Sequence, residues 1–162
     1  MSYAGNFKWE TSVGEDRYRR GMYTYFKRTS PHPNLIAFDC PDSNTTNVKR
    51  RASNTPLQAL TLLNNEVFVE AARGLAKRTL ALEANGDRDR MGRLLRFCIG
   101  RQPEESETRR FVGLLENSRA YFRGEPTAAK SIFGGEEPDP EGAAWVAAAR
   151  IALNLDEFIT RE

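Results

Sequence analysis

The spacing of hydrophobic residues predicts a helical protein. From residue 55 to residue 160, apolar positions recur every three or four residues, as they do along the buried face of an α-helix. No stretch shows the strict alternation that is typical of a strand. Prolines, glycines and asparagines divide the region into successive helices, which are expected over residues 55–64, 66–85, 87–100, 103–124, 126–133 and 141–160. With one more helix near the N-terminus, the pattern predicts a single all-α domain, residues 1–162, with six or seven helices.

The joint between the first two of these helices is polar. Thr55 before Pro56 is a typical helix start, because the threonine accepts hydrogen bonds from free backbone N–H groups. The phase of the apolar residues then shifts at Asn64 and Asn65. Asparagine tolerates the left-handed conformation that ends many helices, and its side chain caps the next one. We therefore expect the joint to turn a corner rather than to carry chemistry.

A helix is also predicted over residues 16–28, since Tyr18, Met22, Tyr25 and Phe26 fall on one helical face. We expect these side chains on the core side, with basic residues opposite. A long loop over residues 29–54 follows and contains three prolines. Loops of this length are uncommon inside compact domains and are often functional. The apolar residues expected to anchor the loop to the core are Leu35, Ile36 and Phe38.

Charge excludes some function classes. The net charge is +2, with +4 in residues 1–51 and −2 in the remainder. A balance so close to zero, with the aromatics of residues 18–26 on the expected core face, argues against a nucleic-acid partner. No apolar run is long enough to span a membrane, and residues 1–10 show no signal-peptide pattern.

Candidate chemistry gathers in the long loop but matches no known motif. His32, Asp39, Cys40 and Asp42 are all metal-ligand types, yet their spacing is not that of a recognised site, and aspartate beside proline is common in turns. A metal site therefore stays open. His32 is the single histidine and no glycine-flanked nucleophile is present, so we predict no catalytic residue. The state of Cys40 and Cys98, paired or free, is also left open.

Arginines near the loop form the best binding hypothesis. A planar guanidinium binds carboxylate, sulfate or phosphate through two hydrogen bonds. The alternative is that these arginines hold the loop by donating to its carbonyl groups. The candidate ligand-binding residues are Arg17, Arg20, Arg50, Arg51, His32 and Asp39.

Three stretches resemble a known family. They are "GEDRYRRGMYTYFKRTSPHPNLIAFDCPD", "NTPLQALTLLNNEVFVEAARGLAKR" and "NLDEFITRE". They are similar to the C-terminal part of a planctomycete domain of unknown function, found at the end of large exported proteins with c-type cytochrome domains. The resemblance covers most of residues 5–162. Two positions depart from the family pattern, since Asn47 stands where a cysteine is usual and Asn65-Glu66 where Asp-Pro is common.

The resemblance implies an exported or periplasmic location, association with cytochrome domains, and bacteria rich in polysaccharide-degrading enzymes. It also implies that the chain is the C-terminal part of a larger domain. The chain has no Cys-x-x-Cys-His sequence, so no haem cofactor is expected on it. The preferred hypothesis is a non-catalytic module that binds other domains of a parent protein or a protein partner. The alternative is part of a glycan-processing enzyme, or a binder of sulfated polysaccharide, with its site on the 29–54 loop.

Overall fold

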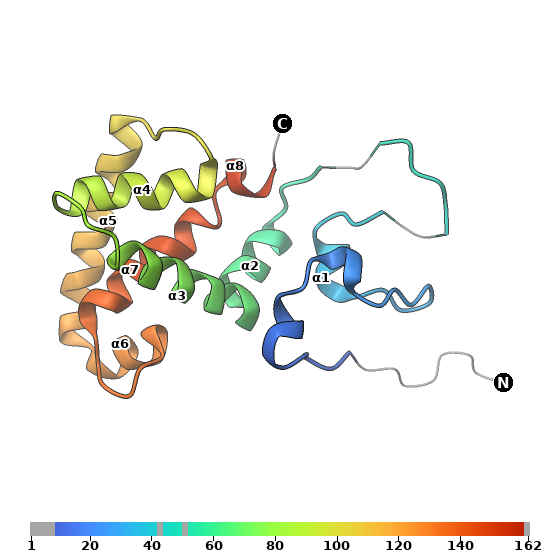
Figure 1. Ribbon diagram of the computed structural model, residues 1–162, viewed down its shortest axis with the longest axis horizontal. Helices are drawn as coiled ribbons and strands as arrows, with labels where there is room; N and C mark the ends of the chain where they lie inside the picture. Colours follow the sequence, from blue (N-terminus) through green and yellow to red (C-terminus); the bar gives the residue numbers. More distant parts are fainter. Residues whose placement is uncertain (1–8, 42–43, 50–51, 161–162) are drawn as a thin grey trace. The chain divides into compact units, whose positions relative to one another are not determined.

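The fold is all-α, as the hydrophobic pattern predicts. The structure is a computed structural model that describes residues 9–41, 44–49 and 52–160, and no strand occurs among them. Six helices of eight or more residues form most of the described chain (Figure 1). The helices are α1 (Pro33–Ala37), α2 (Pro56–Asn64), α3 (Glu66–Leu80), α4 (Asp87–Ile99), α5 (Glu105–Gly124), α6 (Pro126–Phe133), α7 (Pro140–Ala152) and α8 (Asp156–Ile159). None of the helices in these ranges combines the length and apolar character that crossing a membrane requires.

The chain divides into two compact units. The N-terminal unit covers residues 1–61 and the C-terminal unit residues 62–162, so the division falls inside α2. The two units differ in how they bury hydrophobic residues, and each is described by itself below.

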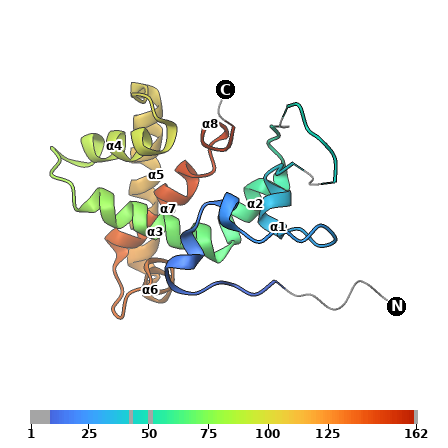
Figure 2. The same ribbon diagram turned by 45° about the vertical axis from the view of Figure 1, so that its right-hand side comes forward.

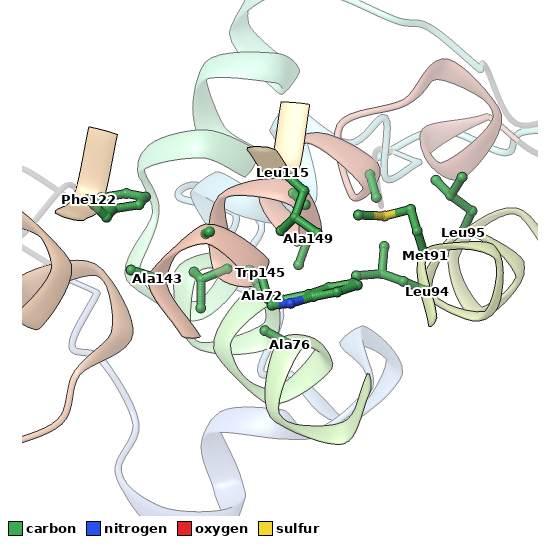
Figure 3. Close-up of a cluster of buried hydrophobic side chains, with 14 of the residues drawn as sticks. Ala72, Ala76, Met91, Leu94, Leu95, Leu115, Phe122, Ala143, Trp145 and Ala149 are labelled. Carbon is green, nitrogen blue, oxygen red and sulfur yellow. The ribbon is translucent and has the colours of Figure 1, made fainter. Parts of the chain in front are cut away.

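The C-terminal unit is built around α7. This helix contacts α3, α4, α5 and α6, which lie around it in both views (Figures 1 and 2). Five of its six alanines are fully buried, and small side chains allow neighbouring helices to approach closely. Trp145 fills the remaining space, with Leu94 of α4 and Ala76 of α3 beside it (Figure 3). The buried set also includes Met91, Leu95, Cys98, Leu115, Phe122 and Ala129.

The joint between α2 and α3 turns the chain as expected, through one asparagine. Asn65 is the N-cap of α3, and its side-chain oxygen accepts a hydrogen bond from the backbone N–H of Val67 at 3.1 Å. Asn64 remains the last helical residue of α2 and is not left-handed, since Asp39 is the one non-glycine residue with positive φ in the described ranges. The expected left-handed C-cap is therefore wrong, whereas the N-cap is confirmed.

The N-terminal unit corrects the prediction of a helix over residues 16–28. Only two short 3-10 helices form there, Gly14–Tyr18 and Gly21–Tyr23. Tyr18, Met22 and Tyr25, which were expected in the core, are 64%, 72% and 67% exposed. In proteins most helical stability comes from burying an apolar face, and a glycine inside the segment weakens it further. Without a face to bury, the segment does not propagate a helix.

The 29–54 segment is irregular except for α1. Leu35 and Phe38 are half-buried, but Ile36 is 57% exposed and does not anchor the segment. Its backbone turns back at Asp39, which adopts the left-handed conformation with a φ of 55°. The Cys40 N–H then donates to the Leu35 carbonyl at 2.8 Å, which closes the end of α1.

Candidate functional site

A pocket of about 350 Å³ lies in the N-terminal unit, and six of its eight lining residues belong to the 29–54 segment that the sequence singles out. Most of its wall is apolar, and one arginine and one thiol complete it. Pockets of at least this size are typical of small-molecule and peptide-anchor sites. The lining residues are Phe26, Arg28, Pro31, Leu35, Ile36, Cys40, Pro41 and Asn44.

His32 lies in the 29–54 segment but not in the pocket lining, and it has a structural role. Its Nδ1 accepts a hydrogen bond from the Asn34 N–H at 3.2 Å, so it caps the start of α1. The Trp9 ring meets it edge-on, with the two ring centroids 5.0 Å apart. Burial lowers the pKa of His32, because the charged imidazolium loses contact with water. Both observations favour the neutral ring with an unprotonated Nδ1.

Asp39 ties the long segment to the start of α2. One carboxylate oxygen, Oδ2, accepts hydrogen bonds from the Ser53 N–H at 2.9 Å and the Ser53 hydroxyl at 2.6 Å. It also accepts one from the Gln58 amide at 3.3 Å. Gln58 is 1% exposed and forms two hydrogen bonds with Thr55. The Gln58 backbone N–H donates to the Thr55 hydroxyl oxygen at 3.3 Å, and the Thr55 backbone N–H donates to the Gln58 side-chain oxygen at 2.9 Å. This reciprocal pair is a capping box, so one glutamine joins a helix cap to the loop closure.

Two of the candidate arginines, Arg17 and Arg20, belong to the described residues. The Arg20 guanidinium lies 5.6 Å from the centroid of the exposed Tyr23 ring, and Arg17 is half-buried. Arg50 and Arg51 lie outside the described residues, so the anion pocket that involves them stays a prediction. Among the described residues, Asp39 ties the loop to Ser53 and Gln58, and the alternative that arginines hold the loop stays a prediction.

The structure brings no metal-binding set together in the described ranges. No group of three or more His, Cys, Asp and Glu side chains able to hold a metal ion occurs among these residues. His32 and Asp39 are engaged in the cap and the loop closure, and Asp42 lies outside the described residues. Cys40 and Cys98 are both free thiols.

Charged clusters in the C-terminal unit connect helices. Arg119 of α5 binds Asp87 at the start of α4 and Glu141 at the start of α7, the latter at 2.5 Å. Glu141 also accepts the Trp145 indole N–H at 2.8 Å. The hydrogen bonds from Arg119 are the main cause of the lowered pKa of both carboxyl groups. This cluster therefore connects three helices and gives the indole N–H of the buried Trp145 a hydrogen-bond acceptor.

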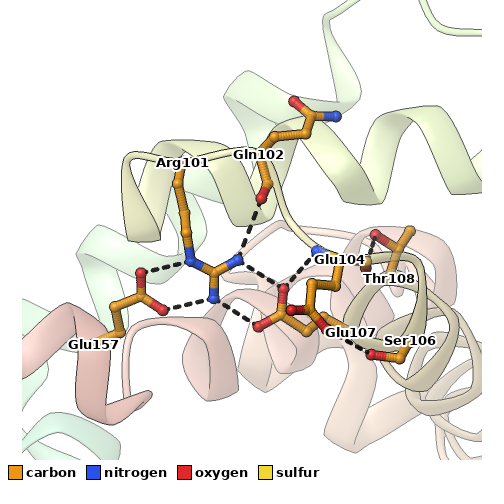
Figure 4. Close-up of polar contacts among 7 residues, drawn as sticks. All are labelled: Arg101, Gln102, Glu104, Ser106, Glu107, Thr108 and Glu157. Atoms are coloured by element: carbon orange, nitrogen blue, oxygen red, sulfur yellow. Dashed lines mark hydrogen bonds and ion pairs between the residues drawn. The ribbon is translucent and has the colours of Figure 1, made fainter.

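A second cluster joins α5 to α8 (Figure 4). The Arg101 guanidinium binds Glu157 at 2.7 Å and Glu107 at 2.8 Å. Glu107 in turn accepts the Glu104 N–H at 2.6 Å, which caps the start of α5. These contacts lower the pKa of Glu107 to about 2, chiefly through the hydrogen bond from Arg101. In both clusters the carboxylates are engaged in ion pairs that connect helices.

The pocket residues Phe26 and Arg28 were missed by sequence reasoning. Both were assigned to the end of a helix that does not form. The available signal was the pair Pro31 and Pro33, which stop a helix and turn the following chain back towards the preceding residues.

Comparison with known proteins identifies a family but no solved or curated relative. No curated protein and no solved structure matches the chain. A family model matches residues 1–115, which include the whole pocket segment and the Asn-Asn joint. The chain therefore belongs to the PSD1 family, described as "Protein of unknown function (DUF1553)".

Proposed function

We propose that the chain is a non-catalytic helical module that binds other domains of a larger exported, cytochrome-associated bacterial protein, or a protein partner of it. The family resemblance of the three sequence stretches supports the parent context. The binding role rests on one observation, that the described residues of the N-terminal unit include no fully buried hydrophobic side chain.

Within the described part of residues 9–61, no hydrophobic side chain is fully buried, and Gln58 is the one residue that is. The same part exposes nine of the twelve large hydrophobic residues that are exposed in the described chain. A folded unit exposes this much apolar surface when a partner covers it. Those with the largest exposed fractions are Val48, Val13, Met22 and Tyr25.

Hydrogen exchange followed by mass spectrometry tests this proposal. The chain is measured alone and with the remaining domains of the parent protein, produced as a separate polypeptide. We expect amide exchange across residues 13–60 to slow on mixing, because covering apolar surface stabilises the backbone beneath it. The amides of residues 143–146 of α7 serve as the internal control, since these residues are buried already. Unchanged exchange in residues 13–60 with every parent domain present contradicts binding to the other domains of the parent protein.

Binding of an anionic polysaccharide is the second candidate. The exposed pair of Arg20 and Tyr23 favours it, since a flat ring stacks on sugars and a guanidinium binds sulfate. Dextran sulfate and uncharged dextran form a matched pair of probes. Saturable binding of the sulfated polymer alone, weakened in both Arg20→Ala and Tyr23→Ala, supports this function. Equal binding by the wild type and both variants contradicts it.

A further inference from the structure

We propose that the pocket of the N-terminal unit holds an apolar anchor residue from an acidic peptide segment of a protein partner. The inference rests on the proposed binding function and specifies the chemistry of its partner. Three features carry it: the composition of the wall, the charge at its edge, and the fixed backbone around it.

The pocket lining is mostly apolar and therefore suits an apolar group. Phe26, Pro31, Leu35, Ile36 and Pro41 supply hydrophobic surface on several sides of a space of about 350 Å³. A volume at the lower end of the usual range for binding pockets accepts one large side chain rather than an extended molecule. The expected anchor is therefore a phenylalanine, leucine or residue of similar size, and its burial supplies the hydrophobic part of the affinity.

The positive charge at the pocket favours acidic residues on either side of the anchor residue in the bound peptide. Arg28 is the one formally charged residue of the lining and is exposed. It forms no ion pair or hydrogen bond in the structure as described. The N-terminal unit around it carries nine Lys and Arg residues against five Asp and Glu residues. This excess attracts an acidic segment and repels a basic one.

The pocket wall is held in place before any ligand arrives. The Ser30 N–H donates to the Lys27 carbonyl at 3.0 Å, which fixes the turn that carries Arg28. The Trp9 indole N–H donates a hydrogen bond to the Ser30 carbonyl at 3.2 Å and so links a distant residue to that turn. Among the lining residues themselves, the hydrogen bond from the Cys40 N–H to the Leu35 carbonyl closes the end of α1. A site that is already ordered loses little conformational entropy on binding.

Cys40 provides a reporter inside the pocket. It is a half-buried free thiol on the pocket wall. The other cysteine, Cys98, is 2% exposed, and burial raises its pKa to about 11. Because the thiolate is the reactive form, a maleimide reagent near neutral pH labels Cys40 and spares Cys98. Labelling also fills the pocket without any change to the sequence, so it blocks binding in a protein that is already folded.

The experiment measures binding by fluorescence anisotropy of three labelled, acetylated hexapeptides. The first has phenylalanine flanked by glutamates, the second has alanine in place of the phenylalanine, and the third has lysines in place of the glutamates. We expect saturable binding of the first peptide alone, and slower labelling of Cys40 when that peptide is present. Treatment with N-ethylmaleimide should abolish the binding.

A charge-reversed variant and a matched control complete the test. Arg28→Glu should weaken the acidic phenylalanine peptide roughly tenfold and strengthen the lysine peptide, because exposed ion pairs contribute modestly. Arg123→Glu makes the same change in net charge on exposed surface of α5 and should leave both affinities unchanged. Circular dichroism confirms that each variant retains its helix content.

Several results would overturn the inference. Equal binding of the phenylalanine and alanine peptides would show that the pocket holds no apolar anchor residue. An equal loss of affinity in Arg28→Glu and Arg123→Glu would show that Arg28 has no specific role. Self-association of the chain that N-ethylmaleimide abolishes would assign the pocket to a second copy instead. If the remaining parent domains slow amide exchange in residues 13–60 while no peptide binds, the pocket inference fails and the proposed module survives. If the peptide binds and the domains have no effect, the pocket stands and the partner is a separate protein.

Discussion

At the scale of single residues, Asp39 connects distant parts of the N-terminal unit, which its sequence context does not suggest. It is the one non-glycine residue with positive φ in the described chain, and its carboxylate accepts three hydrogen bonds. Aspartate is among the few residues that tolerate this backbone conformation. Sequence reasoning placed Asp39 among ligand-binding candidates, because a polar residue in a long loop is a reasonable site residue. Its bonding partners Ser53 and Gln58 lie 14 and 19 positions away, and a local pattern does not reveal such pairs.

Replacing Asp39 tests this closure. Asp39→Ala should destabilise the closed loop by about 2 kcal/mol, since hydrogen bonds to a charged acceptor are lost and a conformation that alanine disfavours is kept. Hydrogen exchange at the Ser53 amide reports the change directly, because that N–H donates to Asp39. We expect the protection of this amide to fall by on the order of tenfold or more. Asp16→Ala is the control, as this exposed carboxylate pairs with Arg19 in the same unit. Loss of protection in both variants would contradict the prediction.

Gly134 is a second residue whose identity the structure requires. It ends α6 with a φ of 79°, and a β-carbon there would lie 3.0 Å from the Arg73 guanidinium carbon. Arg73 donates to the Ile132 and Ser131 carbonyls at 2.8 Å each, which completes the end of the helix. Gly134→Ala should therefore lower the free energy of unfolding by about 1 to 2 kcal/mol.

Urea denaturation measures the effect, with Gly92→Ala as the comparison. Gly92 lies inside α4, where an added β-carbon meets nothing within 4 Å. Alanine should raise stability there by up to about 1 kcal/mol, because it favours the helix. Opposite signs at the two glycines support the account given for Gly134, and a stabilising Gly134→Ala would refute it.

At the scale of elements, the helices that could be predicted are those with a face to bury. The apolar stripes of α4, α5 and α7 correspond to side chains that are buried in the structure, among them Leu94, Leu115 and Trp145. The segment 16–28 shows the same periodicity and forms no α-helix, because the structure gives its aromatics no core to enter. Periodicity indicates that a helix is possible, whereas tertiary packing decides whether it forms.

Arg119 joins three of these helices, and its removal should loosen their packing. Its side chain is 18% exposed and bonds to the first turns of α4 and α7, where acidic residues already favour the helix dipole. Arg119→Met keeps the length of the side chain but leaves Asp87 and Glu141 without their partner. We expect a loss of about 2 kcal/mol in the free energy of unfolding, measured by urea denaturation. Arg123→Met on the exposed face of the same helix should change it by less than about 0.5 kcal/mol. Similar losses in the two variants would show that the ion pairs contribute nothing specific.

The ion pairs of Arg119, and that of Arg101 with Glu107, make the free energy of unfolding depend on pH. The pKa values of Asp87 and Glu141 are lowered in the folded state, and that of Glu107 falls to about 2 from an ordinary value of 4.5. A lowered carboxyl pKa means that the unfolded state binds more protons, so the contribution is full above the unfolded pKa and is lost as the pH falls through the folded one. The free energy of unfolding should therefore be level from pH 7 to about pH 5 and fall between about pH 4.5 and pH 2.

Arg119→Met isolates the share of this dependence that belongs to Asp87 and Glu141. With the guanidinium gone, their pKa values return towards the ordinary range, so the acid-induced loss becomes smaller. Urea denaturation at a series of pH values from 7 to 2 gives both curves. Parallel curves for the wild type and the variant would show that the acid sensitivity has another origin.

At the scale of the whole molecule, fold class was within reach of the sequence and the division into two units was not. Helical periodicity is a local property and predicts an all-α chain. The contrast between a buried alanine-rich helix such as α7 and the exposed aromatics of residues 18–25 depends on which segments meet, and no periodicity records that. For the same reason the loop could be chosen as the place for a site, while the lining residues Phe26 and Arg28 could not.

The two units should therefore differ in stability, and each contains one tryptophan that reports on it. Trp9 belongs to the N-terminal unit and is half-buried, and Trp145 belongs to the C-terminal unit and is fully buried. The N-terminal unit buries no described hydrophobic side chain completely, so its unfolding free energy should be small, whereas α7 and its neighbours form a continuous core. Urea denaturation is followed by tryptophan fluorescence in the wild type and in Trp9→Phe, which leaves Trp145 as the one fluorophore. We expect the Trp9 signal, obtained by difference, to change at a lower urea concentration than the Trp145 signal, with circular dichroism following Trp145. Coincident transitions of the two tryptophans would mean that the chain unfolds as one cooperative unit, which would contradict a separate, lower stability of the N-terminal unit.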